Sequence, residues 1–283
     1  MDAEPFDRAL RRLRRDRAAR AHGDADYLLR HAADELGHRL GAVTREFHRA
    51  LLLGNGSPAL ADMLVARGIE VTVADAGALY AAGGVACDED RLPFGDAAFD
   101  LALSVGVLDG VNDLPGALAL LRRALKPDGL FLGAFAGAGS LPRTRSAMQA
   151  AEEAEGAPAA PRIHPQIDLR AAGDLLSRAG FALPVVDAET VTVRFSSLPR
   201  LVADLRAMAA TNLLRSRSRR PLTRIGYAAA MADFAARADP DGKTGERFEI
   251  VYMLGWAPAP GQPKPARRGS ATASLSDALK PTR

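Results

Sequence analysis

A glycine turn between a short apolar strand and a helix constrains the fold of this chain more than any other stretch. Residues 50–53 (ALLL) form a continuous apolar run, which is typical of a strand buried in a parallel sheet. Gly54 and Gly56 follow at once, and residues 57–68 then predict a helix. Glycines at such a turn let the backbone approach a ligand in front of the helix N-terminus. The stretch therefore predicts the first strand-turn-helix unit of an α/β ligand-binding sheet.

Strand and helix patterns alternate after this turn. Further strands are expected at 70–75, at a short segment ending near residue 87, at 101–104 and at 130–135, with a helix inside 113–129. Later segments predict helices within 145–156 and 168–181, an extended run at 184–195 and a last strand at 247–258. Strands separated by short helical segments indicate an α/β fold: a mainly parallel sheet with helices on both faces.

The beginning of the chain predicts an arginine-rich helix over residues 5–20. Phe6, Leu10 and Leu13 are spaced to share one face, and seven arginines fill most of the remainder. One interpretation is a solvated helix that this apolar stripe fixes to the domain. The other is a basic surface through which the chain docks on a protein partner or an anionic lipid. A second helix is expected at about 25–40.

These patterns divide the chain into three parts. Residues 1–41 form a basic helical extension, residues 42–257 form the α/β domain, and residues 198–238 are a helical insertion within it. Residues 258–283 have the composition of a disordered tail with a short helix in LSDAL.

Composition excludes several classes of function. A net charge of +3 is too small to indicate nucleic-acid binding. The longest apolar stretch, 129–139, is far shorter than a membrane span, and the acidic residues near the N-terminus disfavour a targeting peptide, so we expect a cytoplasmic protein. Cys87 is the single cysteine, interpreted as an inert buried filler. The five histidines lack metal-ligand spacing, so no metal site is expected.

Five residues form the predicted cofactor site. Gly54 and Gly56 provide the turn, and Asp75 ends the next strand 21 residues after Gly54, where a carboxylate can accept hydrogen bonds from ribose hydroxyls. Asp88, after the third strand, lies where an adenine amino group would find an acceptor, and Ser104 at the end of the fourth strand completes the set. The alternative interpretation is that the glycines serve packing alone.

The order of these residues resembles the class I methyltransferase domain, the type that binds S-adenosylmethionine. The phrases DEDRLPFGDAAFDLALS and LRRALKPDGLFLGAF carry the resemblance, which covers residues 45–136 and continues through 175–187. The layout of the whole chain is similar to the branch that holds the assembly factor of respiratory complex I, an arginine hydroxylase. Malonyl-carrier-protein methyltransferases of biotin synthesis are its other near relatives. The resemblance implies a Rossmann-like class I methyltransferase fold and S-adenosylmethionine as cofactor.

Four positions depart from the pattern of this family. Leu52 stands where its strand usually has an acid, Pro58 replaces the third glycine, and Asp109 and Gly110 replace histidine and tryptophan. Loss of one charged acceptor costs about 1.5–3 kcal/mol, or about a ten- to hundredfold loss of cofactor affinity. By analogy Asp109 is a candidate for substrate contact, although a plain loop aspartate is the simpler interpretation. His164 could line a cleft, although an exposed loop histidine is the simpler interpretation.

Three functions follow from these observations. The first is a methyltransferase acting on a protein or a small acid, for which no catalytic residue is named because the cofactor supplies the electrophile. The second is a protein like the complex I assembly factor, either an arginine hydroxylase or a non-catalytic binding protein with a degenerate cofactor site. The third is an NAD-dependent oxidoreductase, because Gly54, Gly56 and Ala59 match that glycine fingerprint; nothing after residue 136 supports it.

Overall fold

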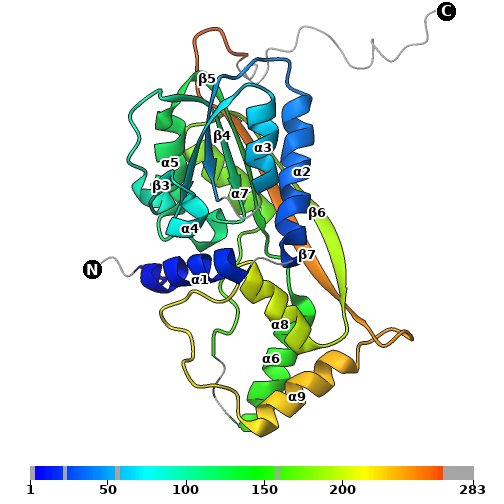
Figure 1. Ribbon diagram of the computed structural model, residues 1–283. Coiled ribbons are helices and arrows are strands. Elements are labelled where there is room, and N and C mark those ends of the chain that lie inside the picture. Colours follow the sequence, from blue (N-terminus) through cyan, green and yellow to red (C-terminus); the bar gives the residue numbers. More distant parts are fainter. Residues whose placement is uncertain (1–3, 22–23, 55–57, 157, 159, 264–283) are drawn as a thin grey trace, which may run out of the picture.

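The computed structural model describes residues 4–21, 24–54, 58–156, 158 and 160–263. In this part of the chain one seven-stranded sheet has the order β3-β2-β1-β4-β5-β7-β6 (Figure 1). The first five strands are parallel, whereas β7 runs antiparallel to both β5 and β6. The predicted α/β fold, a Rossmann-like and mainly parallel sheet, is confirmed.

The elements follow in chain order. The strands are β1 (Arg49–Leu53), β2 (Glu70–Asp75), β3 (Val85–Ala86), β4 (Phe99–Val105), β5 (Leu125–Ala136), β6 (Ala182–Phe195) and β7 (Thr244–Trp256). The helices are α1 (Arg8–Ala21), α2 (Tyr27–Gly41), α3 (Pro58–Ala66), α4 (Ala78–Ala81), α5 (Leu114–Ala124), α6 (Pro142–Glu155), α7 (Leu169–Arg178), α8 (Leu198–Ala207) and α9 (Arg224–Ala235).

Apolar side chains cover both faces of the central strands. Leu51 and Leu53 of β1 lie in a core shared with α5 and α7, whereas Ala50 and Leu52 lie in a core shared with α2 and α3. Leu52 has no exposed surface, so the position where the family usually has an acid is part of the apolar packing here. Two buried faces explain why the strand reads as a continuous apolar run.

The long strands β6 and β7 continue past the parallel strands and support a second layer of helices. Figure 1 shows α6, α8 and α9 below the sheet, beside the lower part of this ribbon. Their apolar side chains form a separate core around Phe195, Leu201 and Phe234. Residues 198–238 contain α8 and α9, with an irregular connection between them.

The fifth strand begins earlier than the sequence suggested. Leu125 already pairs with Phe99 of β4, so the segment expected at the end of the preceding helix belongs to β5. Pro127 explains the difference, because the residue before a proline is pushed away from the helical conformation.

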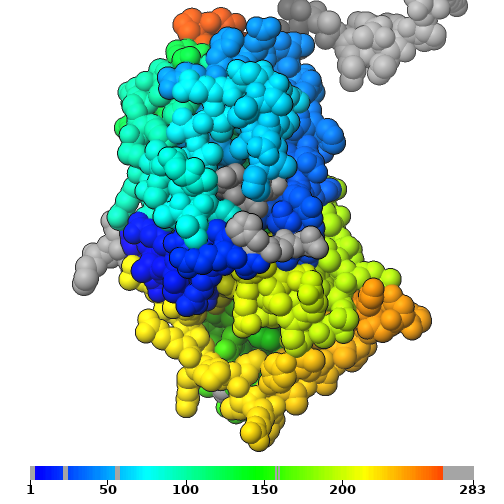
Figure 2. All heavy atoms as spheres, in the orientation of Figure 1, coloured from blue at the N-terminus to red at the C-terminus, as the bar shows by residue number. Residues whose placement is uncertain are grey.

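The first helix packs differently from the prediction. Phe6 precedes α1 and forms an isolated bridge with Leu214, and Leu13 is 44% exposed. Arg11 and Arg15 face inward instead, with 5% and 4% of their surface exposed. Of the predicted apolar stripe, Phe6 and Leu10 pack with Leu213 and Leu214, whereas Leu13 is exposed. The prediction therefore missed that the more buried part of α1 is an arginine face that rests on carboxylates. In Figures 1 and 2 this helix lies between the sheet and the layer of α6, α8 and α9.

Several predictions fall on residues outside the described ranges: the turn residue Gly56, the first residue of the helix expected at 57–68, and the tail from residue 264 onward. Among the helices that the structure describes, none is long and apolar enough to cross a membrane.

Candidate cofactor and acceptor site

The carboxyl ends of the parallel strands bring the described members of the predicted cofactor site to one edge of the sheet. Leu53 pairs with Ala74 on one side and with Ser104 on the other, so the ends of β1, β2 and β4 are neighbours. Gly54 follows with φ +82°, and a Cβ atom there would lie 2.5 Å from the Val105 carbonyl oxygen. The turn therefore requires glycine both for its backbone conformation and for its contact with β4.

Two buried polar atoms at this edge lack a hydrogen-bond partner within the described part of the chain. They are the Ser104 hydroxyl and Oδ1 of Asp88. Ser104 has no exposed surface, and Asp88 is 2% exposed. Buried polar atoms are nearly always paired, so an orphaned one indicates an absent partner such as a ligand or water.

The Asp75 carboxylate, by contrast, is already engaged by the first helix. Both of its oxygens accept hydrogen bonds from the Arg15 guanidinium, through Nε at 3.0 Å and through Nη2. The Gly77 amide donates to Oδ1 at 2.7 Å, and only 1% of Asp75 is exposed. The Arg15 guanidinium also lies over the Tyr80 ring, 4.3 Å from its centroid, which adds a cation–π contact.

Two further arginines of α1 also bind carboxylates at this edge of the sheet. Arg12 donates to Oδ2 of Asp88 at 2.5 Å. Arg11 forms a two-pronged pair with Glu89, at 2.5 and 2.7 Å. Burial acts to lower the pKa of Arg11, but the Glu89 carboxylate outweighs it, so the pKa is raised. Arg11 and Glu89 are both buried, so the carboxylate keeps the Arg11 guanidinium charged.

A third pair joins Arg8 to Asp90 at 2.6 and 2.7 Å. Burial works to raise the pKa of Asp90, but hydrogen bonds from Arg8 and from the Asp113 amide leave it below its usual range. The hydrogen bond to Asp90 raises the pKa of Arg8 in turn.

The inward face of α1 is a feature that the sequence analysis missed. Arg8, Arg11, Arg12 and Arg15 have the spacing i, i+3, i+4, i+7, which puts them on one face of a helix. This arginine stripe was readable from the sequence. The acids at 75, 88, 89 and 90 that receive it were also visible, yet only the fold brings the two sets together.

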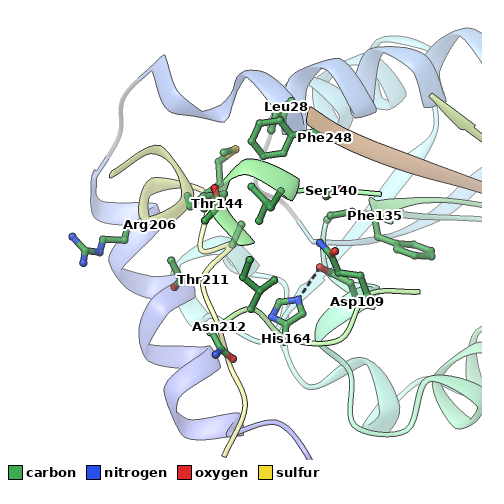
Figure 3. Close-up of a pocket in the computed structure, with 18 of the residues that line it drawn as sticks. Leu28, Asp109, Phe135, Ser140, Thr144, His164, Arg206, Thr211, Asn212 and Phe248 are labelled. Atoms are coloured by element: carbon green, nitrogen blue, oxygen red, sulfur yellow. Dashed lines mark ion pairs between the residues drawn. The ribbon is translucent and has the colours of Figure 1, made fainter. Parts of the chain in front are cut away.

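A cavity of about 620 Å³ adjoins this edge of the sheet (Figure 3). Gly106, Ala134 and Phe135 from the ends of β4 and β5 form one wall. The remaining apolar lining comes mainly from α2, α6, α8 and β7, including Leu28, Ala32, Met148, Val202, Leu205 and Phe248. The cavity thus lies where the sheet meets the added helices.

Asp109 and His164 form a pair in the wall of this cavity. Their side chains approach to 3.5 Å, which Figure 3 marks with a dashed line. The His164 side chain is 11% exposed, its ring packs edge-on against Phe6 at 5.6 Å, and Nδ1 lacks a partner within the described ranges. The interpretation of His164 as an exposed loop histidine is therefore wrong, and Asp109 is more than a plain loop aspartate. The two positions are far apart in sequence, so no local pattern joins them.

Guanidinium groups give this cavity a positive character. Arg14 and Arg17 of α1, Arg206 of α8 and Arg217 all contribute to its lining. Arg14 donates to the carbonyl of Asn212. Burial, and then the neighbouring charges of Arg217, Arg206 and Arg17, lower the pKa of Arg14. Such crowding of like charges favours a bound anion.

Comparison with known proteins places the chain in a family. A family model described as a methyltransferase domain matches residues 51–133. The mitochondrial arginine-hydroxylase NDUFAF5 of Danio rerio is 35% identical over 97% of this chain and 89% of its own length. The human NDUFAF5 is 32% identical over 96% of this chain and 82% of its own length.

The chain belongs to the NDUFAF5 family.

Other relatives and solved structures agree with this fold. A malonyl-[acyl-carrier protein] O-methyltransferase of Xylella fastidiosa is 34% identical over 60% of this chain and 56% of its own length. The YcgJ protein of Bacillus subtilis superposes with a TM-score of 0.54 at 14% identity, covering 81% of this chain and 99% of that protein. This member of the NDUFAF5 family is therefore a methyltransferase-fold protein, as the sequence predicted.

A buried carboxylate sets the position of α6 in this NDUFAF5-family chain. Glu246 of β7 has no exposed surface and accepts hydrogen bonds from the Thr144 amide and hydroxyl, both at 2.7 Å. The amides of Arg143 and Arg247 donate to its other oxygen, at 3.1 and 3.0 Å. The carboxylate thus caps the N-terminus of a helix that lines the cavity.

Cys87 is half-buried at the end of β3, in agreement with an inert filler. Burial, followed by the nearby Glu89 and Asp88 carboxylates, raises the pKa of its thiol to about 11. Within the described ranges no three His, Cys, Asp or Glu side chains are grouped as metal ligands would be.

Proposed function

We propose that this NDUFAF5-family chain binds S-adenosylmethionine at the carboxyl edge of β1, β2 and β4 and methylates an acid held in the adjoining cavity. The position of that cavity carries the proposal. Its wall at Gly106 and Ala134 continues the same strand ends that hold Gly54 and Ser104. Ligands of open α/β sheets bind at the carboxyl ends of the strands.

The residues at this edge suit the cofactor. Gly54 allows close approach of the backbone, Asp75 is the predicted acceptor for the ribose hydroxyls, and Asp88 is the predicted acceptor for adenine. The orphaned Ser104 hydroxyl and Asp88 oxygen are polar atoms that such a ligand would satisfy. Gly56, which lies outside the described residues, stays a predicted member of this site. Bound S-adenosylmethionine supplies an electrophilic methyl group, so the chain has chiefly to position the acceptor.

The charge of the cavity supports an acid as the acceptor. Arg206 and Arg217 lie on elements other than α1, and both contribute to the lining. A carboxylate held among guanidinium groups and apolar side chains would present one oxygen to the methyl carbon. The new C–O bond forms as the C–S bond of the sulfonium breaks, giving a methyl ester and a neutral thioether. The malonyl-[acyl-carrier protein] O-methyltransferase relative is named for an acid substrate of this kind.

Arginine hydroxylation is the second candidate, because the relatives with the widest coverage are named for it. An arginine side chain would enter the cavity as a cation. Asp109 could face it, yet that carboxylate is already paired with His164, and five arginine residues line the same space: Arg14, Arg17, Arg162, Arg206 and Arg217. Like charges in one cavity oppose such a substrate.

Competing substrates test the proposal directly. The full chain is incubated with S-adenosylmethionine and either a malonyl thioester of pantetheine or an arginine-containing peptide. We expect formation of S-adenosylhomocysteine with the thioester, and a product heavier by one methylene group. Arg206→Gln should raise KM for the thioester about tenfold, the loss expected for one charged hydrogen bond. A parallel sample of the peptide is supplied with dioxygen and a reductant; product formation from the peptide alone, with a mass gain of one oxygen atom, would favour the hydroxylase.

Three further expectations from the sequence stay predictions. They are the division into a basic extension, a domain and a tail, a protein partner docking on the arginine-rich helix, and a cytoplasmic place of action. The relatives from animals are named as mitochondrial.

A further inference from the structure

We infer that α1 is an internal competitor for the adenosine end of the cofactor site: the docked helix closes the site, and the cofactor binds only when the α1 arginines leave Asp75 and Asp88. This inference rests on the proposed binding of S-adenosylmethionine. It concerns how that site opens, about which membership of the family says nothing.

The first argument is the state of Asp75. The Asp75 carboxylate has little acceptor capacity left for a ribose diol, because Oδ1 already accepts hydrogen bonds from Arg15 and from the Gly77 amide, and Oδ2 accepts one from Arg15. Only 1% of Asp75 is exposed, so there is no room for a ribose beside the guanidinium. Oδ2 of Asp88, at the predicted adenine position, is engaged by Arg12 in the same way. Guanidinium and adenosine therefore exclude each other at these acids.

The second argument is that the helix backbone, and not merely its side chains, fills the space. A Cβ atom on Gly77 would lie 2.5 Å from the Cβ of Arg15, so α1 touches the turn that follows β2. The carboxylate of Asp16 accepts a hydrogen bond from the Leu79 amide at 3.0 Å, which caps the short helix α4 from outside. A rotation of the Arg15 side chain alone would leave this contact in place, so the helix itself has to move.

The third argument is that α1 docks through a polar face and leaves two buried polar atoms without hydrogen bonds in the described part of the chain. Its buried face is made of Arg11, Arg15 and two alanines, while Leu13 points to solvent. Buried ion pairs add little net stability, because desolvation offsets most of the Coulomb attraction. With α1 docked, Asp88 Oδ1 and the Ser104 hydroxyl also stay unsatisfied within the described ranges. A ligand that pairs with these atoms can therefore compete.

The same helix also closes the acceptor cavity. Arg14 and Arg17 of α1 contribute to the cavity lining, while Arg8, Arg11, Arg12 and Arg15 hold the acids at the sheet edge. Figure 2 shows α1 in the seam between the sheet and the added helices. Displacement of one helix would thus open both halves of the site together.

Calorimetric titration of the full chain with S-adenosylhomocysteine tests the inference. Arg15→Met removes the guanidinium at Asp75, Arg12→Met removes the half-exposed one at Asp88, and Arg20→Met makes the same change at an exposed position of α1. We expect Arg15→Met to bind S-adenosylhomocysteine at least about tenfold more tightly than the wild type, because α1 is docked in a smaller fraction of the molecules. Arg12→Met should show a smaller gain, and Arg20→Met should match the wild type.

The outcomes separate the two proposals. Equal affinity for the wild type and both inward-facing variants overturns the competition and leaves the cofactor proposal intact. Weaker binding by Arg15→Met, with an unchanged circular dichroism spectrum, also overturns it, since the arginine would then assist the ligand. No heat with any of the proteins at millimolar ligand overturns cofactor binding and the competition together. A gain in Arg12→Met alone would still support competition if Arg15→Met fails to fold.

Discussion

The strongest prediction concerns α1 in the absence of any ligand: Arg15→Met should detach this helix without unfolding the sheet. Arg15 and Asp75 are 4% and 1% exposed, and the pair is joined by two hydrogen bonds. Removing one member of a buried ion pair costs about 3–5 kcal/mol, because the other charge stays buried and uncompensated. Loss of the contact with the Tyr80 ring adds about 0.5–1 kcal/mol.

Native-state hydrogen exchange measures this loss directly, because the exchange rate of a protected amide follows the free energy of the opening that exposes it. A loss of about 3–5 kcal/mol corresponds to exchange faster by a factor of about a hundred to several thousand in α1. Amides of β4 and β5 should keep their wild-type rates, since both strands lie in the central core. The Arg20→Met variant, with the same change at an exposed position, should leave α1 unaltered.

Two results would refute this reasoning. If α1 exchanges only through global unfolding, at the same rate as β4 and β5 in every variant, the helix is an integral part of the fold and not a detachable cover. If Arg15→Met and Arg20→Met change α1 equally, the buried pair with Asp75 does not hold the helix.

Three further predictions follow from single groups. Glu246→Gln should lower the free energy of unfolding in urea by about 2–3 kcal/mol, because the wild-type carboxylate accepts hydrogen bonds through two oxygens and the glutamine amide has only one. If exposed Glu153→Gln loses as much, the capping role of Glu246 is contradicted. Cys87 should react slowly with iodoacetamide at pH 8 and faster up to its pKa of about 11; native and urea-unfolded rates that agree would argue against burial. The pKa of Asp90 is lowered from 3.8, so its contribution to α1 docking is present above about pH 4 and lost as the pH falls further. The protection factors of α1, which correct for slower intrinsic exchange in acid, should therefore fall at low pH, and less so in Asp90→Asn; identical pH profiles would exclude Asp90.

Local patterns predicted the sheet but not what covers its edge. Neighbouring residues in the sequence are enough to predict β1 from the apolar run at 50–53 and its following glycine, and to predict that β2 ends at Asp75. The structure has both strands where they were expected. The buried face of the first helix was only partly predicted, because apolar spacing identified Phe6 and Leu10 but not the arginines beside them. Its arginines bind acids that lie 60 or more residues away, as in the pair of Arg15 with Asp75.

The acceptor cavity was harder to foresee. Asp109 and His164 meet because the segment before α7 pairs with the chain just after β5, where the Ala138 amide donates to the Ile167 carbonyl, and this is a long-range contact. The crowding of Arg14 with Arg206 and Arg217 likewise joins distant parts of the chain. Residues in such a cavity come from four or more elements, so no single window of sequence contains them.

The central claim is tested most directly by whether a bound ligand raises or lowers the hydrogen-exchange rate of α1. Hydrogen exchange of the wild-type chain is compared with and without saturating S-adenosylhomocysteine. If adenosine takes Asp75 and Asp88 from the arginines, α1 should exchange faster in the complex while the ends of β1 and β2 become more protected. If α1 instead becomes more protected together with those strand ends, the helix closes over a bound cofactor and the competition is contradicted.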